Sequence, residues 1–318
     1  MSYAVLFPGQ GSQFVGMGES LFARRSDLLV DAADEVLGWS LRQVCLEGPE
    51  ERLTRTEYAQ PALFAVAFAL WEEVSERLEI PPVAAAGHSL GEYTALAAAG
   101  VLDFRTALEV VAARGRAMAE ASDAEPSAMA ALLGADVETA ERIAAGRRSE
   151  GGRLWVANVN APGQVVVAGA DDDIAWLEDR ARELGVRRAV RLKVAGAFHS
   201  PFMASAAGRL REVLVGATIS PPRFPVYANV TAAPADVGEL VGLLSDQVVS
   251  TVRFSESLER IAADTGADAF VHVGPGDVTA GMAKRSVPGS ETLVVSDPED
   301  IEGAVDELST MQRPGGDR

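Results

Sequence analysis

A serine bracketed by two glycines, in the stretch AAGHSLGEYTA at residues 85–95, is the feature that most constrains this chain. Gly-x-Ser-x-Gly between a short apolar run and an Ala-rich helical segment is typical of the nucleophile elbow, a sharp turn from a strand into a helix. Such a turn projects the serine hydroxyl from the sheet, and it needs small residues where strand and helix approach each other. The sequence therefore predicts Ser89 as a nucleophile and the amide of Leu90 as a donor to a developing oxyanion.

Apolar runs alternate with helical patterns on either side of this turn. Residues 3–7 and 81–87 are short runs that contain or end at Pro or Gly, and they indicate buried strands. Residues 60–78, 90–100 and 105–121 have the length and spacing of helices. This order favours an α/β architecture with a parallel sheet.

The middle of the chain has a different order of elements. The pattern is strand, helix, strand, strand, helix, strand, at 128–135, 136–146, 153–160, 163–170, 172–185 and 186–194. That order is typical of a ferredoxin-like module. We therefore predict an α/β fold with these parts: a large α/β-hydrolase-like subdomain with a parallel sheet (1–125 and 197–306), an inserted ferredoxin-like small subdomain (126–196) and a disordered tail (307–318).

Composition and charge exclude several classes of protein. The chain of 318 residues carries a formal net charge of -18, which argues against nucleic-acid binding and gives no attraction to anionic membranes. Cys45 is the only cysteine, so no intrachain disulfide can form. No apolar run approaches the roughly 20 residues that span a bilayer, and the start of the chain lacks the basic segment of a signal peptide. We expect a cytoplasmic protein, and a monomer because no large apolar stripe is left over.

A serine nucleophile needs a base, and the chain has three histidines. His88 is adjacent to the serine in the chain, so a hydrogen-bonded role in the turn is the simpler interpretation. His272 lies in an apolar strand, where packing is the simpler interpretation. His199 follows the inserted segment in a loop, and loops at subdomain junctions are where sites form. We therefore predict His199 as the base, and the spacing of the three histidines does not indicate a metal site.

Six short segments carry a family resemblance: FPGQGSQ (7–13), QPALF (60–64), GHSLGEY (87–93), ARGRAM (113–118), GAFHS (196–200) and VGPG (273–276). Together, and in this order, they resemble the acyltransferase family of fatty-acid and polyketide synthesis, which includes the malonyl-CoA:acyl-carrier-protein transacylases. The likeness covers nearly the whole chain. A large α/β part with an inserted small subdomain is also what the resemblance implies for the fold.

The resemblance implies roles for individual residues. Ser89 would form an acyl ester, with His199 as general base and then general acid. The backbone amides of Gln10 and Leu90 would form the oxyanion hole. Arg114 would bind the free carboxylate of a malonyl group, a task that suits a guanidinium fork better than a lysine.

Two further residues have roles by the same resemblance. The backbone carbonyl of Gln247 would orient the histidine, which agrees with the lack of an acidic residue at a strand end between Ser89 and His199. Phe198, beside the histidine, favours malonyl over methylmalonyl groups, although one methylene is worth only about 1–3 kcal/mol.

The implied reaction is a ping-pong transfer of malonyl from malonyl-CoA to the phosphopantetheine thiol of an acyl carrier protein, with no metal or other cofactor. Two alternatives stay open at this point: a serine thioesterase or esterase, with water as the acceptor, and an inactive docking module. The chain departs from the family's usual residues at Thr251, His272 and Asp277, none of which is an expected catalytic residue.

The carrier protein in this family is itself acidic, so we expect a local basic surface on this acidic chain. Strand alternation over 186–194 places Arg187, Arg191 and Lys193 on one face and Arg188, Val190 and Leu192 on the other. The basic face is the expected docking surface. A solvated strand face without a partner is the alternative.

Overall fold

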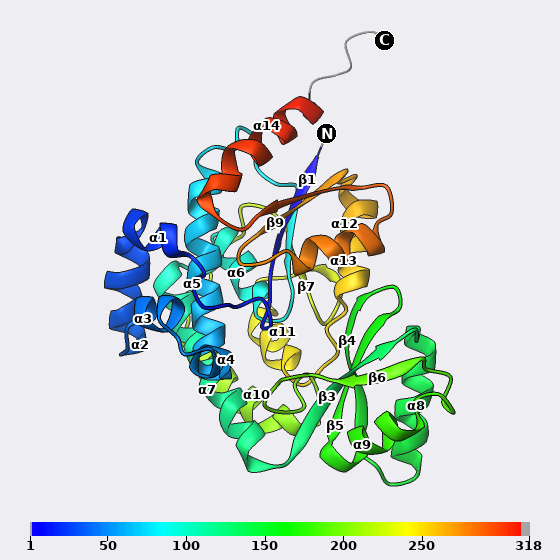
Figure 1. Cartoon of the computed structure of the whole chain (residues 1–318). Coiled ribbons are helices and arrows are strands. Elements are labelled where there is room, and N and C mark those ends of the chain that lie inside the picture. The colour runs from blue at the N-terminus through cyan, green and yellow to red at the C-terminus, as the bar shows by residue number, and fades with distance from the viewer. Residues whose placement is uncertain (1, 313–318) are drawn as a thin grey trace, which may run out of the picture.

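Two β-sheets organise the computed structural model, which describes residues 2–312 and the side chains of residues 2–310 (Figure 1). The larger sheet has the order β10 (Glu291–Val295), β9 (Ala269–Val273), β1 (Tyr3–Phe7), β2 (Ala84–Gly87), β7 (Val226–Ala228) and β8 (Ala233–Pro234). Its strands are parallel except β8. The smaller, antiparallel sheet has the order β4 (Leu154–Ala161), β5 (Gln164–Ala170), β3 (Ser127–Leu133) and β6 (Arg188–Arg191). The predicted mixed α/β fold with a parallel sheet is confirmed.

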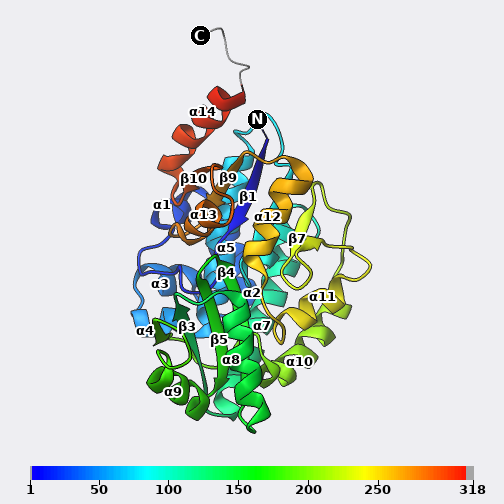
Figure 2. The same ribbon diagram turned by 90° about the vertical axis from the view of Figure 1, so that its right-hand side faces the viewer.

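Helices cover both faces of the larger sheet (Figure 2). One face packs on α5 (Thr56–Ser75), α6 (Gly91–Ala98) and α7 (Phe104–Ala124), and the other on α12 (Phe254–Thr265) and α13 (Val278–Ser286). In β1, Val5 and Phe7 face the first group and Ala4 and Leu6 face the second. Successive side chains of a strand point to opposite faces, so the uniformly apolar β1 is buried on both.

The remaining helices of the larger part extend this core. They are α1 (Glu19–Arg24), a π-helical segment (Asp27–Ala32), α2 (Ala33–Leu37), α3 (Leu41–Leu46), α4 (Glu50–Thr54), α10 (Ala204–Val215), α11 (Leu240–Gln247) and α14 (Ile301–Gln312), with short 3₁₀ turns at Pro201–Met203 and Pro298–Asp300. Within residues 2–312, no helix combines the length and the apolarity needed to cross a membrane.

The helix α14 corrects one expectation. Disorder from 307 onward is wrong for residues 307–312, because they form the second half of α14 and Leu308 is buried against the core. Residues 313–318 lie outside the described residues. The sequence around Leu308 has helical spacing, but its role depends on a core that is distant in the chain.

The smaller sheet has a core of its own on one face. Helices α8 (Val137–Ser149) and α9 (Asp171–Arg180) cover that face and pack on Leu132 and Val167. Met129 and Val166, on the opposite face, belong to the core of the larger part. The small sheet therefore packs on its own helices with one face and on the larger part of the molecule with the other.

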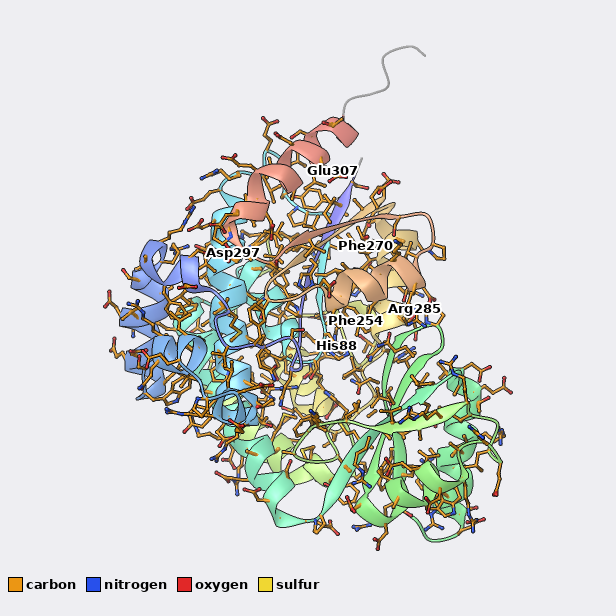
Figure 3. The ribbon with its side chains drawn as sticks, in the orientation of Figure 1. His88, Phe254, Phe270, Arg285, Asp297 and Glu307 are labelled. Carbon is orange, nitrogen blue, oxygen red and sulfur yellow. The ribbon has the colours of Figure 1, made fainter. Side chains whose placement is uncertain are left out.

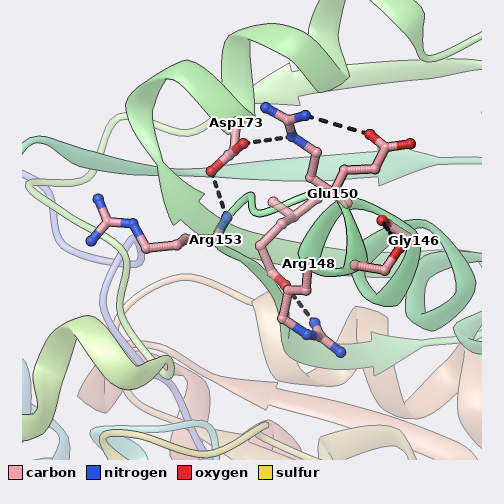
Figure 4. A network of polar contacts seen from close by, with 8 residues as sticks. Gly146, Arg148, Glu150, Arg153 and Asp173 are labelled. Carbon is pink, nitrogen blue, oxygen red and sulfur yellow. Dashed lines mark hydrogen bonds and ion pairs between the residues drawn. The ribbon is translucent and has the colours of Figure 1, made fainter.

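A polar network joins α8 to α9 (Figure 4). Asp173, which is 5% exposed, accepts hydrogen bonds from Nε of Arg147 at 2.6 Å and from the backbone amide of Arg153 at 2.7 Å. The guanidinium carbon of Arg147 also lies 4.8 Å from the centroid of the Trp176 ring. A buried carboxylate is stable here because it has both an opposite charge and a backbone amide donor.

Backbone hydrogen bonds join β4 of the smaller sheet to the segment that precedes α12 in the larger part. The amide of Val159 donates to the carbonyl of Val252 at 2.9 Å, and the amide of Val252 donates to Ala157 at 2.9 Å. Thr251 adds a side-chain bond to the Val156 carbonyl at 2.7 Å, and these contacts place the end of β4 against the start of α12. The strand β4 is therefore held close to the carboxyl ends of the parallel strands.

Candidate active site

The turn around Ser89 has the geometry that the sequence predicts. β2 ends at Gly87, α6 begins at Gly91, and Ser89 has φ 51°. A Cβ on Gly87 would lie 1.8 Å from the carbonyl carbon of Gly91, and a Cβ on Gly91 would lie 2.3 Å from the Phe7 oxygen. Both glycines are therefore required for close packing of backbone on backbone, and the left-handed conformation of the serine costs about 1–3 kcal/mol.

Asn229 holds this strained turn in place. Its Oδ1 accepts the amide of Ser89 at 2.8 Å, and its Nδ2 donates to the Gly87 carbonyl at 2.8 Å. Asn229 is fully buried in the segment after β7. Sequence reasoning missed this residue, because nothing local to it indicates that it reaches a turn 140 residues away.

His199 lies directly against the serine. Its Nε2 is 2.8 Å from the Ser89 hydroxyl oxygen, and its Nδ1 is 2.7 Å from the Gln247 carbonyl. A carbonyl only accepts, so Nδ1 carries the proton and Nε2 is left to accept from the serine hydroxyl. His199 also has a positive φ of 59°, and its amide donates to the carbonyl of Val248 at 3.1 Å.

The environment of His199 keeps its ring neutral. The residue is 4% exposed, and burial lowers its pKa from 6.5 to about 3, with the positive charge of Arg114 as the second cause. The hydrogen bond to Gln247 acts in the opposite direction and is too weak to reverse the shift. A neutral imidazole with Nε2 facing a hydroxyl is ready to accept its proton.

Arg114 is buried directly behind the serine. The side chain is 1% exposed, and its Nη2 lies 3.0 Å from the Ser89 oxygen and 2.9 Å from Oε1 of Gln247. Its Nη1 donates to Oε1 of Gln60 at 2.7 Å, and its guanidinium carbon lies 5.3 Å from the Tyr93 ring. All these partners are neutral.

The charge of Arg114 has no direct counter-ion in the described part of the chain. No carboxylate of residues 2–310 lies within 4.0 Å of the guanidinium, and its Nε has no hydrogen-bond partner there. Burial accordingly lowers the pKa of Arg114. A buried cation with spare donors is well suited to bind an anion, because unpaired charges in the interior are costly.

Gln60 is the second residue that sequence reasoning missed as part of the site. Its Oε1 accepts from Arg114, and its Nε2 lies 3.4 Å from Oε1 of Gln10. Gln60 stands at the start of the QPALF segment, so a signal for it was present, but a lone glutamine in an apolar helix does not indicate its partner. It is 1% exposed in α5.

The two amides expected in the oxyanion hole are both free of other partners. Gln10 follows β1 in the loop that begins at Pro8, and Leu90 follows the serine. Neither backbone amide donates a hydrogen bond within residues 2–312. Unpaired amides at a strand end and at a helix start are the donors that an oxyanion requires.

A cleft of about 240 Å³ opens in front of the serine, between the larger sheet and the small one. Ser89, His199 and Gln60 line it from the larger part, and Val166 and Leu192 line it from the small sheet. Phe198, which is 6% exposed, contributes an aromatic wall beside the histidine. The cleft therefore joins a polar end at the serine to an apolar wall.

The other two histidines have structural partners. Nε2 of His88 lies 2.7 Å from Oδ1 of Asn160 on β4, and its ring meets Phe254 edge-on, with centroids 5.4 Å apart (Figure 3). His272 is fully buried, with Nδ1 2.5 Å from the Thr279 hydroxyl and Nε2 3.0 Å from the Gly274 carbonyl. His88 thus connects the serine turn to the small sheet, and His272 is packed.

The basic strand is less available than its sequence indicates. β6 covers only Arg188–Arg191, and Arg191 forms ion pairs with Asp171 and Glu178 of α9. Leu192 and Val194, on the other face, line the cleft, and Lys193 is exposed between them with no ion pair among the described residues. The positive charge of Arg191 is therefore already neutralised within the small sheet.

Comparison with known proteins agrees with this geometry. A family model described as an acyl transferase domain matches residues 5–296. The chain belongs to the acyl transferase family. The resemblance in the six sequence segments is thereby confirmed.

Two relatives in this family are similar to the chain over nearly their whole length. The malonyl CoA-acyl carrier protein transacylase of Bacillus subtilis is 42% identical, over 96% of each chain. A polyketide biosynthesis malonyl CoA-acyl carrier protein transacylase of Bacillus velezensis is 39% identical, over 88% of this chain and 95% of its own.

Solved structures of acyl transferases have the same fold. The transacylase of Coxiella burnetii superimposes with a TM-score of 0.91 at 33% identity, over 97% of this chain and 98% of its own. A malonyl-transacylase in complex with its type II polyketide acyl-carrier protein superimposes with a TM-score of 0.91 at 35% identity, over 96% of this chain and all of its own.

Proposed function

We propose that this chain transfers a malonyl group from malonyl-CoA to the phosphopantetheine thiol of an acyl carrier protein. The observation that carries the proposal is the buried Arg114 guanidinium, 3.0 Å from the Ser89 oxygen and without a carboxylate partner among the side chains of residues 2–310. A nucleophile next to an unneutralised cation suits an acyl group that ends in a carboxylate. The names of its relatives support the same substrate and the same partner.

The first half-reaction forms an ester at Ser89. Nε2 of His199 takes the hydroxyl proton while the serine oxygen attacks the thioester carbonyl, and the amides of Gln10 and Leu90 stabilise the tetrahedral oxyanion. The C–S bond then breaks, and the CoA sulfur leaves with the proton that His199 returns. Loss of one amide donor raises such a barrier by about 2.7–4 kcal/mol.

The second half-reaction reverses the first with another thiol. His199 removes the proton of the phosphopantetheine thiol, whose sulfur attacks the ester carbonyl. The serine oxygen leaves and regains a proton from the histidine. The carbonyl of Gln247 supports both steps, because it holds the same ring tautomer throughout.

Arg114 selects the acyl group by its charge. The malonyl carboxylate replaces neutral acceptors of the guanidinium, such as Oε1 of Gln60 or Gln247, with a charged one. Phe198 narrows the cleft near the α-carbon and disfavours a methyl branch by about 1–3 kcal/mol.

The division of the chain belongs to the same proposal. The small subdomain comprises residues 126–196 and is ferredoxin-like, which the sheet order β4-β5-β3-β6 and its separate core support. Residues 1–125 and 197–306 form the α/β-hydrolase-like part, supported by its parallel sheet and by the serine turn after β2. A cytoplasmic monomer is the setting we propose.

One assay separates the proposal from its rivals. The protein is incubated with labelled malonyl-CoA, with and without phosphopantetheinylated carrier protein. Label on the carrier supports transfer, free malonate indicates a thioesterase, and neither product indicates an inactive docking module. Intact-mass detection of a malonyl adduct of about 86 Da, which should be absent in S89A, tests the ester intermediate at Ser89.

A further inference from the structure

Glu92 is a buried carboxylate that the proposed reaction does not use. It is 1% exposed in the first turn of α6, one turn after the serine. Burial raises its pKa to about 7, while hydrogen bonds from Gln247 and Asn229 and the charge of Arg114 favour the ionised form. Burying an acid is costly unless hydrogen bonds compensate for the lost water, so the contacts of Glu92 decide its role.

The side chain of Glu92 contacts the side-chain amide of Gln247. Its Oε2 accepts from Nε2 of Gln247 at 2.7 Å and from the backbone amide of Asn229 at 3.1 Å. No Lys, Arg or His of the described residues forms an ion pair with it. Both hydrogen-bond partners of the carboxylate are therefore neutral groups.

Gln247 contacts both Arg114, which we call the clamp for the malonyl carboxylate, and His199, the proposed base. Its Oε1 accepts from Nη2 of Arg114 at 2.9 Å, while its Nε2 also donates to the Ser89 carbonyl at 2.9 Å. Its backbone carbonyl accepts from His199. Gln247 thus accepts a hydrogen bond from Arg114 with its side chain and one from His199 with its main chain.

The orientation of this amide is dictated by its neighbours. If the amide turned over, its NH₂ group would face the Arg114 donors, and its oxygen would face the Glu92 carboxylate and the Ser89 carbonyl. Donors would then face donors and acceptors would face acceptors, so the bonds of Gln247 to Arg114, Ser89 and Glu92 would all be lost. The carboxylate is the strongest acceptor of the set, because a charged acceptor forms bonds roughly twice as strong as a neutral one.

We propose that Glu92 is a positioning residue: its carboxylate fixes the orientation of the Gln247 amide, and through that amide the position of the Arg114 guanidinium. The inference rests on the proposed function, because it assigns Arg114 to the malonyl carboxylate. The main chain at Gln247 is held separately as the last turn of α11. Glu92 therefore acts on the clamp more than on the base.

The test compares two acyl donors in the E92Q variant. Glutamine keeps the size of the side chain but can present either NH₂ or oxygen to Gln247, so the orientation of that amide is then set by Arg114 and the Ser89 carbonyl alone. The rate constant for acylation of Ser89 is measured by intact mass with malonyl-CoA and with acetyl-CoA, whose acyl group has no carboxylate. We expect malonyl acylation to fall at least about tenfold and acetyl acylation to stay within about twofold.

The matched control is E73Q. Glu73 is also a largely buried acid, 9% exposed, but it pairs with Arg24 near the C-terminal end of α5, whereas the cleft-lining Gln60 lies near the start of that helix. Its loss should lower the unfolding temperature and leave the malonyl-to-acetyl ratio unchanged. E92D supplies a second variant, since it keeps the charge with a shorter reach and should lose less malonyl acylation than E92Q.

A coupled variant makes the route through Arg114 falsifiable. In an R114A background the clamp is already gone, so adding E92Q should change malonyl acylation by less than about twofold. Equal losses with both donors, no change with either donor, or additive losses in the double variant each overturn the inference. Failure of the wild type to transfer malonyl at all would instead overturn the proposed function, so the two failures are distinct.

Discussion

Both expected catalytic side chains sit on backbone in the left-handed region, where only glycine is unstrained. Ser89 has φ 51° and His199 has φ 59°, and each conformation costs about 1–3 kcal/mol. The strain is balanced by bonds from distant segments, such as Asn229 to the serine amide and the Val248 carbonyl to the histidine amide. The strained backbone holds the Ser89 hydroxyl oxygen and Nε2 of His199 2.8 Å apart.

The buried histidine predicts an unusual pH dependence. Its pKa lies below the ordinary value, at about 3, so the neutral base persists as the pH falls through 6.5 and is lost only near 3. We expect the rate at which a fluorophosphonate labels Ser89 to vary by less than about twofold between about pH 8 and 5. A decline with an apparent pKa near 6.5 would contradict this account.

Gln60 offers a test of the clamp at the same scale. Q60E changes a neutral acceptor of Arg114 into a carboxylate of the same shape, 2.7 Å from Nη1 in the parent side chain. The new carboxylate should occupy the guanidinium in place of malonyl, and kcat/KM for malonyl-CoA should fall roughly a hundredfold, or about 3 kcal/mol. Steady-state kinetics and a melting curve check it; unchanged malonyl kinetics in a folded Q60E would argue against the assigned role.

At the scale of elements, the site depends on how closely three pieces of backbone approach. The start of α6 lies against the end of β2 and the end of β1, with glycine at both contact points. Replacing either glycine forces backbone atoms apart, and backbone cannot move aside as a side chain can. The parallel pairing of β1 with β2 then brings the loop after Phe7, with Gln10, to the serine.

Two glycine-to-alanine variants compare a position packed against backbone with a position that has no neighbour near its Cβ. G91A places its Cβ 2.3 Å from the Phe7 oxygen, and we expect it to lower the free energy of unfolding by more than about 4 kcal/mol or to prevent folding. G146A, in α8 with nothing within 4 Å of its Cβ, should instead raise it by about 0.5–1 kcal/mol. Urea unfolding measures both, and similar stabilities for the two variants would rule out this explanation.

For the whole molecule, the charge is unevenly divided. Residues 126–196 hold ten acidic and ten basic side chains, so the net charge of -18 lies entirely in the rest of the chain. An acidic partner meets less repulsion at the small sheet than elsewhere. The cleft opens between the two parts, so a partner that reaches Ser89 passes this neutral wall.

Lys193 is the basic residue of the predicted docking strand that we expect to matter. It is exposed between the cleft-lining Leu192 and Val194, whereas Arg191 is already paired. K193E should slow malonyl transfer to the carrier protein about tenfold without changing acylation by malonyl-CoA. R77E is the matched control, since Arg77 lies after α5, at the opposite end of the sheet from the serine. Equal loss in both half-reactions would refute the docking role.

Local features of the sequence predicted much of the fold and the centre of the site. β1 has the predicted bounds, and the serine turn lies between the predicted strand and helix, because short apolar runs and paired glycines act over a few residues. Helix α5 begins at Thr56, four residues before the start expected at Gln60. The short strands β7, β8 and β10 were not expected, since β7 and β8 have only three and two residues and β10 begins with the exposed, polar Glu291 instead of forming a uniformly apolar run like β1.

The sequence by itself determined that a serine stands in a strained turn, that a histidine and an arginine belong to the same motif set, and that the chain is an acidic α/β protein. Only the tertiary structure decided that Gln60, Asn229 and Glu92 complete the polar network, that Arg191 is neutralised, and that residues 307–312 are helical. The reason is physical: a backbone turn is specified by neighbours in the chain, whereas the partner of a buried polar group is whichever group folding brings beside it.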